Sequence, residues 1–170
     1  MAIALVLGVS GCSAASTPAQ PPPTTTTVPA SADALPRVDL ISKAITALEA
    51  KLGAPQQYFE INATSHLVNL FVALNDGKVV QPWVYLDGEL SSTEGHTATG
   101  FSFSKAALDF DPAKVLTRVQ SQLPQSTPDV FFIEGGKGGT VRYSVTVSSK
   151  QGGQLVVVLG PDGTVKSVET

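Results

Sequence analysis

The chain has 170 residues, of which 42% are hydrophobic and 15% are charged, and its formal net charge at pH 7 is −3. This length has room for one ordinary domain or two very small ones. The weak negative charge argues against binding to nucleic acid, which needs a clustered basic surface. The single cysteine excludes a disulfide framework within the chain and any metal site built from cysteines alone.

The N-terminal residues have the pattern of a secretory signal. Residues 2–7 are apolar, and the small residues Val9, Ser10 and Gly11 follow before the lone cysteine, Cys12. The apolar segment is too short to cross a bilayer, which takes about 20 residues. The sequence therefore predicts a signal peptide over residues 1–11. An ordinary secretory signal that is removed together with Cys12 is the alternative.

The four residues from Val9 to Cys12 resemble the lipobox of bacterial lipoproteins of the actinobacterial type. The resemblance implies that the Cys12 thiol receives a diacylglycerol, that the signal is cleaved, and that the new amino group is acylated. Each buried methylene then contributes about 0.8 kcal/mol to membrane binding. We therefore expect a lipid anchor on Cys12 that holds the protein on the extracytoplasmic side of the cell membrane.

Residues 12–35 have the composition of a tether. After the cysteine, the segment consists almost entirely of Ser, Ala, Thr and Pro, including three consecutive prolines and four consecutive threonines. Such a segment has little apolar surface to bury, so we expect it to be disordered or to adopt polyproline II.

The next part of the chain has the pattern of one helix followed by three strands. Apolar residues recur at helical spacing over residues 40–52, with Asp39 placed to cap the start and Gly53 to end the helix. The turn at residues 75–77 predicts a hairpin, and Pro82 predicts an edge strand or a bulge. The three strand-like runs cover residues 58–61, 67–74 and 79–86.

The C-terminal part repeats this order. Asp111 is placed to cap a second helix, Pro112 suits its first position, and an apolar stripe runs over residues 115–123. Residues 160–163 form a turn signal. The strand-like runs here cover residues 130–134, 140–147 and 154–159, with a short run at 164–168.

These patterns predict an α+β fold of two repeated units, each a helix packed on a three- to four-stranded antiparallel sheet. The first unit covers residues 36–90, a connector covers 91–108, and the second unit covers 109–170. Small units of this kind are marginally stable alone, so we expect the two to share one core.

The sequence resembles two protein families, the first through its order of elements and the second through its N-terminal anchor and tether. The run from Tyr143 to Val147 and the run from Val157 to Val165 are similar to the strands of PepSY domains. That resemblance implies an extracytoplasmic domain that restrains or binds protein partners. The anchor, the tether and Asp111-Pro112-Ala113 also resemble lipid-carrying lipoproteins of the mycobacterial cell envelope, which implies a hydrophobic ligand.

Motifs for catalysis are nearly absent from the sequence. Ser102 and Lys105 match S-x-x-K, but its partner motifs are missing. The glycine-rich run at residues 135–139 precedes a strand-like run, whereas a phosphate loop precedes a helix. His66 and His96 lie outside any familiar ligand spacing. We therefore expect neither enzymatic activity, nor a cofactor, nor a metal.

Trp83 and Tyr85 are the candidate partner-binding residues. They occupy alternate positions of one strand-like run, so their side chains share a face beside Pro82. Trp and Tyr are favoured at contact surfaces, and burial in the core is the alternative.

We expect a non-enzymatic binding or regulatory module that is anchored in the cell membrane and contacts a protein or another envelope component. The alternative is a carrier of a lipid or other hydrophobic ligand in the envelope, which requires a cavity between helix and sheet.

Overall fold

The computed structural model describes residues 34–169. The predicted signal, the lipobox at Val9, Ser10, Gly11 and Cys12, and most of the predicted tether lie outside these residues. The described chain contains two α-helices, α1 (Ile41–Leu52) and the shorter α2 (Val115–Gln122). Within residues 34–169, no helix is long and apolar enough to cross a membrane.

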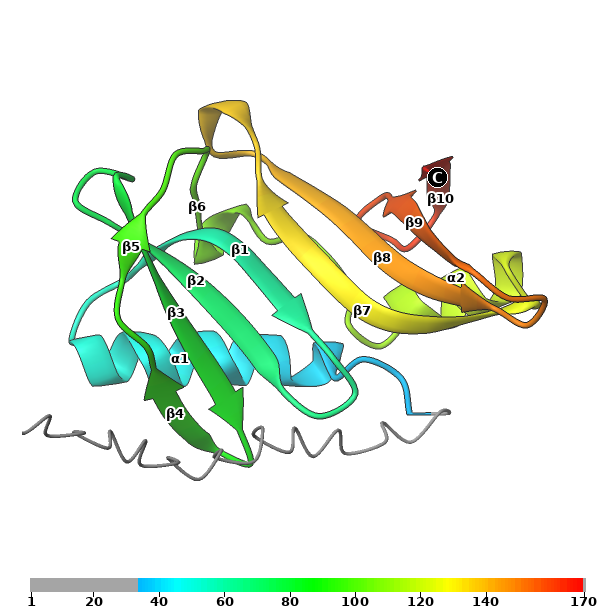
Figure 1. Cartoon of the computed structure of the whole chain (residues 1–170), viewed down its shortest axis with the longest axis horizontal. Coiled ribbons are helices and arrows are strands. Elements are labelled where there is room, and N and C mark those ends of the chain that lie inside the picture. Colours follow the sequence, from blue (N-terminus) through cyan, green and yellow to red (C-terminus); the bar gives the residue numbers. More distant parts are fainter. Residues whose placement is uncertain (1–33, 170) are drawn as a thin grey trace, which may run out of the picture.

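The strands form one ten-stranded, antiparallel sheet (Figure 1). Its main path runs in the order β10-β9-β8-β7-β1-β2-β3-β4, while β5 pairs with β3 and β6 pairs with β1. The strand bounds are β1 (Gln57–Ala63), β2 (Val68–Leu74), β3 (Val79–Leu86), β4 (Glu89–Ser92), β5 (His96–Thr97), β6 (Phe103–Ser104), β7 (Ser126–Gly135), β8 (Val141–Ser149), β9 (Gln154–Leu159) and β10 (Val165–Glu169).

This topology contradicts the predicted fold of two repeated helix-on-sheet units. The strands of the N-terminal and C-terminal parts belong to one sheet, which is joined in its middle by β1 and β7. Ile61 lies opposite Ile133 and Ala63 opposite Phe131 across this junction. Residues 34–169 therefore form a mainly-β structure with one long α-helix and one short one.

The physical reason for the single sheet lies in the backbone of the two joining strands. A separate unit would leave one side of β1 and one side of β7 with unpaired N–H and C=O groups, which is a liability at a sheet edge. Pairing β1 with β7 satisfies both sets at once. Local periodicity shows which residues form a strand, but it carries no information about which strand is its neighbour.

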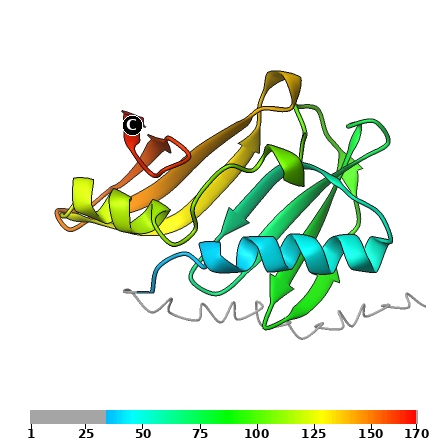
Figure 2. The ribbon, with the colours of Figure 1, turned by 180° about the vertical axis from the view of Figure 1, so that it is seen from behind.

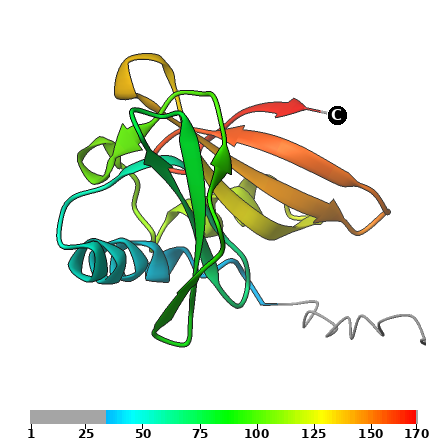
Figure 3. The ribbon, with the colours of Figure 1, turned by 60° about the vertical axis from the view of Figure 1, so that its left-hand side comes forward.

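Both helices lie on the same face of the sheet (Figure 2). One continuous hydrophobic core lies between this face and the helices, and it includes residues from both ends of the sheet, such as Leu70 of β2 and Val157 of β9. The sheet twists strongly between the β3–β4 hairpin and the β8–β9 pair (Figure 3). The core residues of α1 are Ile41, Ala44, Ile45 and Leu48.

The predicted end of α1 is confirmed, whereas the predicted cap at its start is wrong. As predicted, Gly53 ends α1. It has a φ of 76°, and its N–H donates to the carbonyl of Glu49. Asp39 does not cap α1, because it lies within a 3-10 turn over Val38–Leu40 and pairs with Arg37 at 3.0 Å. Pro82 lies where the outer neighbour of β3 changes from β5 to β4, which suits a residue without an N–H.

Candidate functional site

The face of the sheet without helices, here called the open face, carries both aromatic and polar side chains. Strand alternation places Ile61, Leu70 and Val72 toward the helices and the residues between them toward the open face. The open face is turned toward the viewer in Figure 1. Its central residues are Glu60 and Asn62 of β1, Asn69 and Phe71 of β2, and Phe132 and Glu134 of β7.

A hollow of about 310 Å³ lies on the open face near the β1–β7 junction. Its sheet residues come from β1, β2, β3 and β7, and its remaining wall is the crossing segment, residues 98–101, which leads from β5 toward β6. The lining residues are Phe59, Glu60, Phe71, Val80, Ala98, Thr99, Gly100, Phe101, Glu134 and Gly135.

Glycines allow the crossing segment to approach the sheet closely. A Cβ atom at Gly135 would overlap the backbone of Phe101, so only glycine at the end of β7 leaves room for the segment. A Cβ at Gly100 would lie 3.5 Å from the Phe59 ring. Phe101, which belongs to this segment, lines the hollow and is 56% exposed.

A chain of side-chain hydrogen bonds ends at Glu60 in the floor of the hollow. The Asn69 amide nitrogen donates to the side-chain oxygen of Asn62 at 2.7 Å, and the Asn62 amide nitrogen donates to Glu60 Oε1 at 2.7 Å. Asn62 is only 7% exposed. Because both amides donate in the direction of Glu60, the Glu60 carboxylate is the final acceptor of this series of hydrogen bonds.

The electrostatic environment of Glu60 is unfavourable for its charge. Desolvation by burial raises the pKa of Glu60, the hydrogen bond from Asn62 opposes the shift, and the nearby charge of Glu134 raises the pKa further. Glu134 lies directly opposite Glu60 across the β1–β7 ladder, where paired Cβ atoms are about 5 Å apart. Like charges at that distance favour protonation of one of them.

Arg142 is the basic side chain that pairs with Glu134. Its guanidinium lies 3.5 Å from Glu134 and 2.8 Å from Glu169, so it divides its charge between two carboxylates. Over residues 34–169, no Lys, Arg or His forms an ion pair with Glu60. The hollow therefore combines aromatic walls with a carboxylate that lacks a basic partner there.

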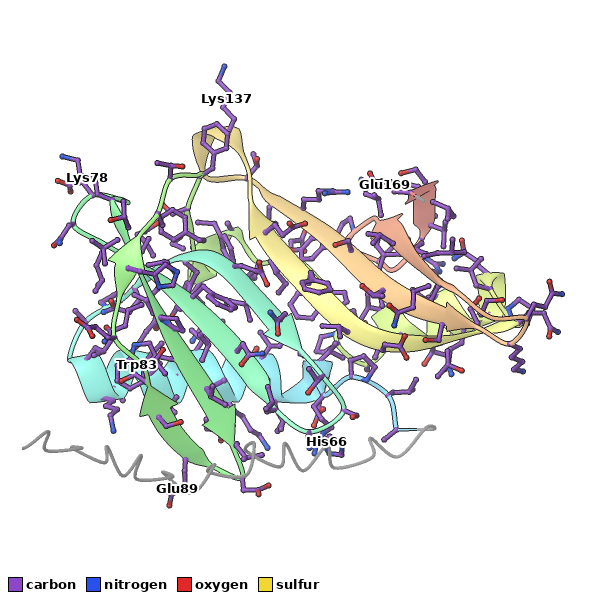
Figure 4. All side chains as sticks on the ribbon, in the orientation of Figure 1. His66, Lys78, Trp83, Glu89, Lys137 and Glu169 are labelled. Atoms are coloured by element: carbon purple, nitrogen blue, oxygen red, sulfur yellow. The ribbon has the colours of Figure 1, made fainter. Side chains whose placement is uncertain are left out.

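The structure places the predicted candidates Trp83 and Tyr85 on the opposite side of the sheet, which α1 covers. Figure 4 labels Trp83. Trp83 belongs to the core and is 7% exposed, and Tyr85 is half-buried. The Lys51 ammonium lies 5.8 Å from the centre of the Trp83 ring, and the buried indole N–H has no hydrogen-bond partner among the described atoms. Partner binding by this pair stays a prediction.

The other motifs of the sequence lie apart from one another. The Lys105 ammonium donates a hydrogen bond to the Thr46 hydroxyl of α1 at 3.1 Å, and not to Ser102. Of the glycine-rich run, Gly135 ends β7 and residues 136–139 lie in the turn between β7 and β8, where Lys137 points away from the body (Figure 4). His66 and His96 are exposed. In the described part of the chain, no group of three His, Cys, Asp or Glu side chains could hold a metal ion.

Sequence reasoning missed the hollow, although part of its signal is present. Strand alternation alone puts Glu60 and Asn62 on the opposite face of their strand from Ile61, and it puts Phe71 on the same face as Asn69. The approach of Glu134 to Glu60 depends on the long-range β1–β7 pairing. That pairing has no local signal.

Comparisons with known proteins give no relative: no family model, curated protein or solved structure matches the chain. The function is therefore inferred from the chemistry of the residues themselves, and the resemblances to lipoproteins and to PepSY domains stay predictions.

Proposed function

We propose that this chain is a non-enzymatic module, anchored by a lipid on Cys12 at the extracytoplasmic side of the cell membrane, that binds an envelope protein through the open face. The anchor is supported by the lipobox pattern from Val9 to Cys12. The tether-like composition of residues 12–35 suits a domain displayed at some distance from the membrane.

The observation that carries the binding role is the hollow on the open face. Aromatic side chains are enriched at protein interfaces, and here Phe59 and Phe71 are half-buried and Phe101 is exposed on a sheet face without a helix. The desolvated carboxylate of Glu60 in the same hollow carries an energetic cost. A partner that supplies a hydrogen-bond donor would offset this cost.

The packing between α1 and the sheet supports a binding module over a hydrophobic carrier. A carrier needs an apolar cavity there. Instead, Ile41, Ile45 and Leu48 of α1 are fully buried, as are Leu70 and Val72 of β2 beneath them. These side chains fill the space where an acyl chain would lie.

Site-specific photo-crosslinking in living cells tests the proposal. The full-length, lipidated protein would carry benzoylphenylalanine at Phe101 on the open face or, as a control, at the exposed Thr117 of α2. We expect a discrete protein adduct from position 101 that is absent from position 117. Equal adducts from both positions, or adducts from position 117 only, would contradict the proposal, and lipid that co-purifies with the native protein would favour the carrier.

A further inference from the structure

We propose that the hollow on the open face holds an arginine side chain of the protein partner, with the guanidinium between Glu60 and Glu134 and against the surrounding phenylalanine rings. This inference rests on the proposed function and names the chemical group that the open face recognises.

The floor of the hollow offers hydrogen-bond acceptors to a ligand. Asn69 donates to Asn62, and Asn62 donates to Glu60 Oε1, so each of these two side-chain amides already uses one of its N–H groups within the protein. The remaining capacity of the Glu60 carboxylate, like that of Glu134, is acceptor capacity. A ligand that only donates hydrogen bonds, such as a guanidinium, is complementary to this arrangement.

The charges around the hollow favour a cation. Glu60 and Glu134 lie opposite each other on adjacent strands, and Arg142 sits on the far side of Glu134, where it also pairs with Glu169. The hollow therefore has two carboxylates on its floor and a shared positive charge at one side only. An added cation would neutralise the repulsion between the two glutamates.

The aromatic rings of the hollow favour a guanidinium over an ammonium. The planar guanidinium stacks on aromatic rings and forms hydrogen bonds in two directions within its plane, whereas an ammonium is a compact, strongly hydrated charge. Rings from three places in the chain, Phe59, Phe71 and Phe101, surround the two carboxylates. The volume of about 310 Å³ accommodates the end of an arginine side chain.

The environment of Glu60 supports the same ligand. The charged groups that face it are Glu134 from β7 and, next to Glu134, Arg142 from β8, while β2 and the crossing segment present Asn69, Phe71 and residues 98–101 without charge. The pKa of Glu60 is raised in this setting. A bound guanidinium favours the ionised carboxylate, so binding weakens as Glu60 is protonated at acidic pH.

An NMR titration tests the proposal with defined probes. The full-length chain, with Cys12→Ser to prevent lipidation, would be titrated with the peptide Ac-Ala-Arg-Ala-NH₂, with its neutral citrulline analogue and with its lysine analogue. We expect saturable shifts for the arginine peptide, confined to the amides of residues 59–60, 71, 98–101 and 134. The citrulline peptide should bind at least about tenfold more weakly, because it lacks the charge.

Two variants with the same change in net charge complete the test. Glu60→Gln removes a carboxylate that is costly to bury and so should retain the fold, and we expect it to weaken arginine binding about tenfold or more. Glu89→Gln removes an exposed carboxylate on β4 and should leave binding unchanged within about twofold. Equal binding of the citrulline or lysine peptide, or an unchanged affinity in Glu60→Gln, would overturn the arginine assignment.

The outcome also separates this inference from the proposed function. If the photo-adduct from position 101 forms and survives Glu60→Gln, the open face binds a partner but the arginine assignment is wrong. If the adduct forms in the parent protein and is lost in Glu60→Gln, while Glu89→Gln retains it, both proposals are supported. If no adduct forms from position 101, the proposed function fails, whatever the arginine peptide does.

Discussion

Replacing Phe131 with alanine tests whether the two parts of the sheet unfold together. Phe131 lies on β7 at the β1–β7 junction, is fully buried, and has its ring 5.5 Å from Phe110 and 6.2 Å from Tyr143. Truncation of a buried phenylalanine to alanine costs about 3–5 kcal/mol of unfolding free energy. With a urea dependence of about 2 kcal/mol per molar, the unfolding midpoint should fall by about 1.5–2.5 M.

The assay uses the only tryptophan of the chain, which lies in the other part of the sheet. Trp83 is on β3, buried beneath α1. Its fluorescence reports unfolding of the N-terminal part, while far-UV circular dichroism reports the whole chain. In a single cooperative sheet, both midpoints shift together by the full amount when Phe131 is truncated.

A neighbouring residue provides the matched control. Phe132 is on the same strand but on the open face and is half-buried, so Phe132→Ala should cost less than half as much as Phe131→Ala. If Phe131→Ala moves the circular dichroism transition but leaves the Trp83 midpoint unchanged, the two parts are independent units and the reasoning from a single sheet is refuted.

Three further predictions address local features. Gly163→Ala should lower the free energy of unfolding by about 2–4 kcal/mol, because Gly163 has a φ of 82° and its Cβ would lie 2.5 Å from the Val115 carbonyl oxygen. Gly152 also has a positive φ but open space around it, so Gly152→Ala should cost about 1 kcal/mol in the same denaturation experiment. Equal losses in the two variants would show that the contact with Val115 does not matter. For Glu60, the raised pKa means that its own contribution to stability is most favourable when the carboxyl is protonated, and that this contribution is lost as the pH rises from 4.5, its ordinary pKa, through the raised pKa of the folded state. Denaturation between pH 4 and pH 7 should show this loss in the parent protein but not in Glu60→Gln, and parallel curves would argue against a desolvated Glu60. Cys12→Ala should move the protein from the membrane fraction to the soluble fraction, and retention in the membrane would exclude the lipid anchor.

Local patterns in the sequence predict most of the individual elements. The hairpin of β2 and β3 follows from two alternating runs around the turn at residues 75–77, and all three turn residues have positive φ. The end of α1 follows from Gly53, which adopts the left-handed conformation that glycine tolerates. These features depend on neighbours in the sequence, so their signals are local.

The start of α2 differs from the predicted start because the preceding residues form a turn. The second helix is predicted to start at Asp111 and Pro112, but α2 starts at Val115. Residues 112–114 instead form a turn in which the Asp111 side chain accepts a hydrogen bond from the Ala113 N–H at 2.9 Å. An aspartate side chain stabilises such a turn as readily as a helix start.

The candidate site depends on information that a single sequence does not contain. Glu60 and Glu134 are far apart in the chain and meet only because β1 pairs with β7. Gly135 belongs to a glycine-rich run in the sequence, but in the structure it ends β7 and lies against the backbone of the crossing segment. Trp83 and Tyr85 occupy the face beneath α1, and composition alone does not distinguish that face from an exposed one.

The most direct test of the central claim compares photo-adducts from the open face with those from the helix face in intact cells. The measurement is the yield of a discrete protein adduct from benzoylphenylalanine at position 101, relative to position 117, with the lipidation sequence intact. Binding through the open face predicts an adduct at position 101 that is at least several times more abundant. An adduct that is equally abundant at both positions, or stronger at position 117, would contradict it.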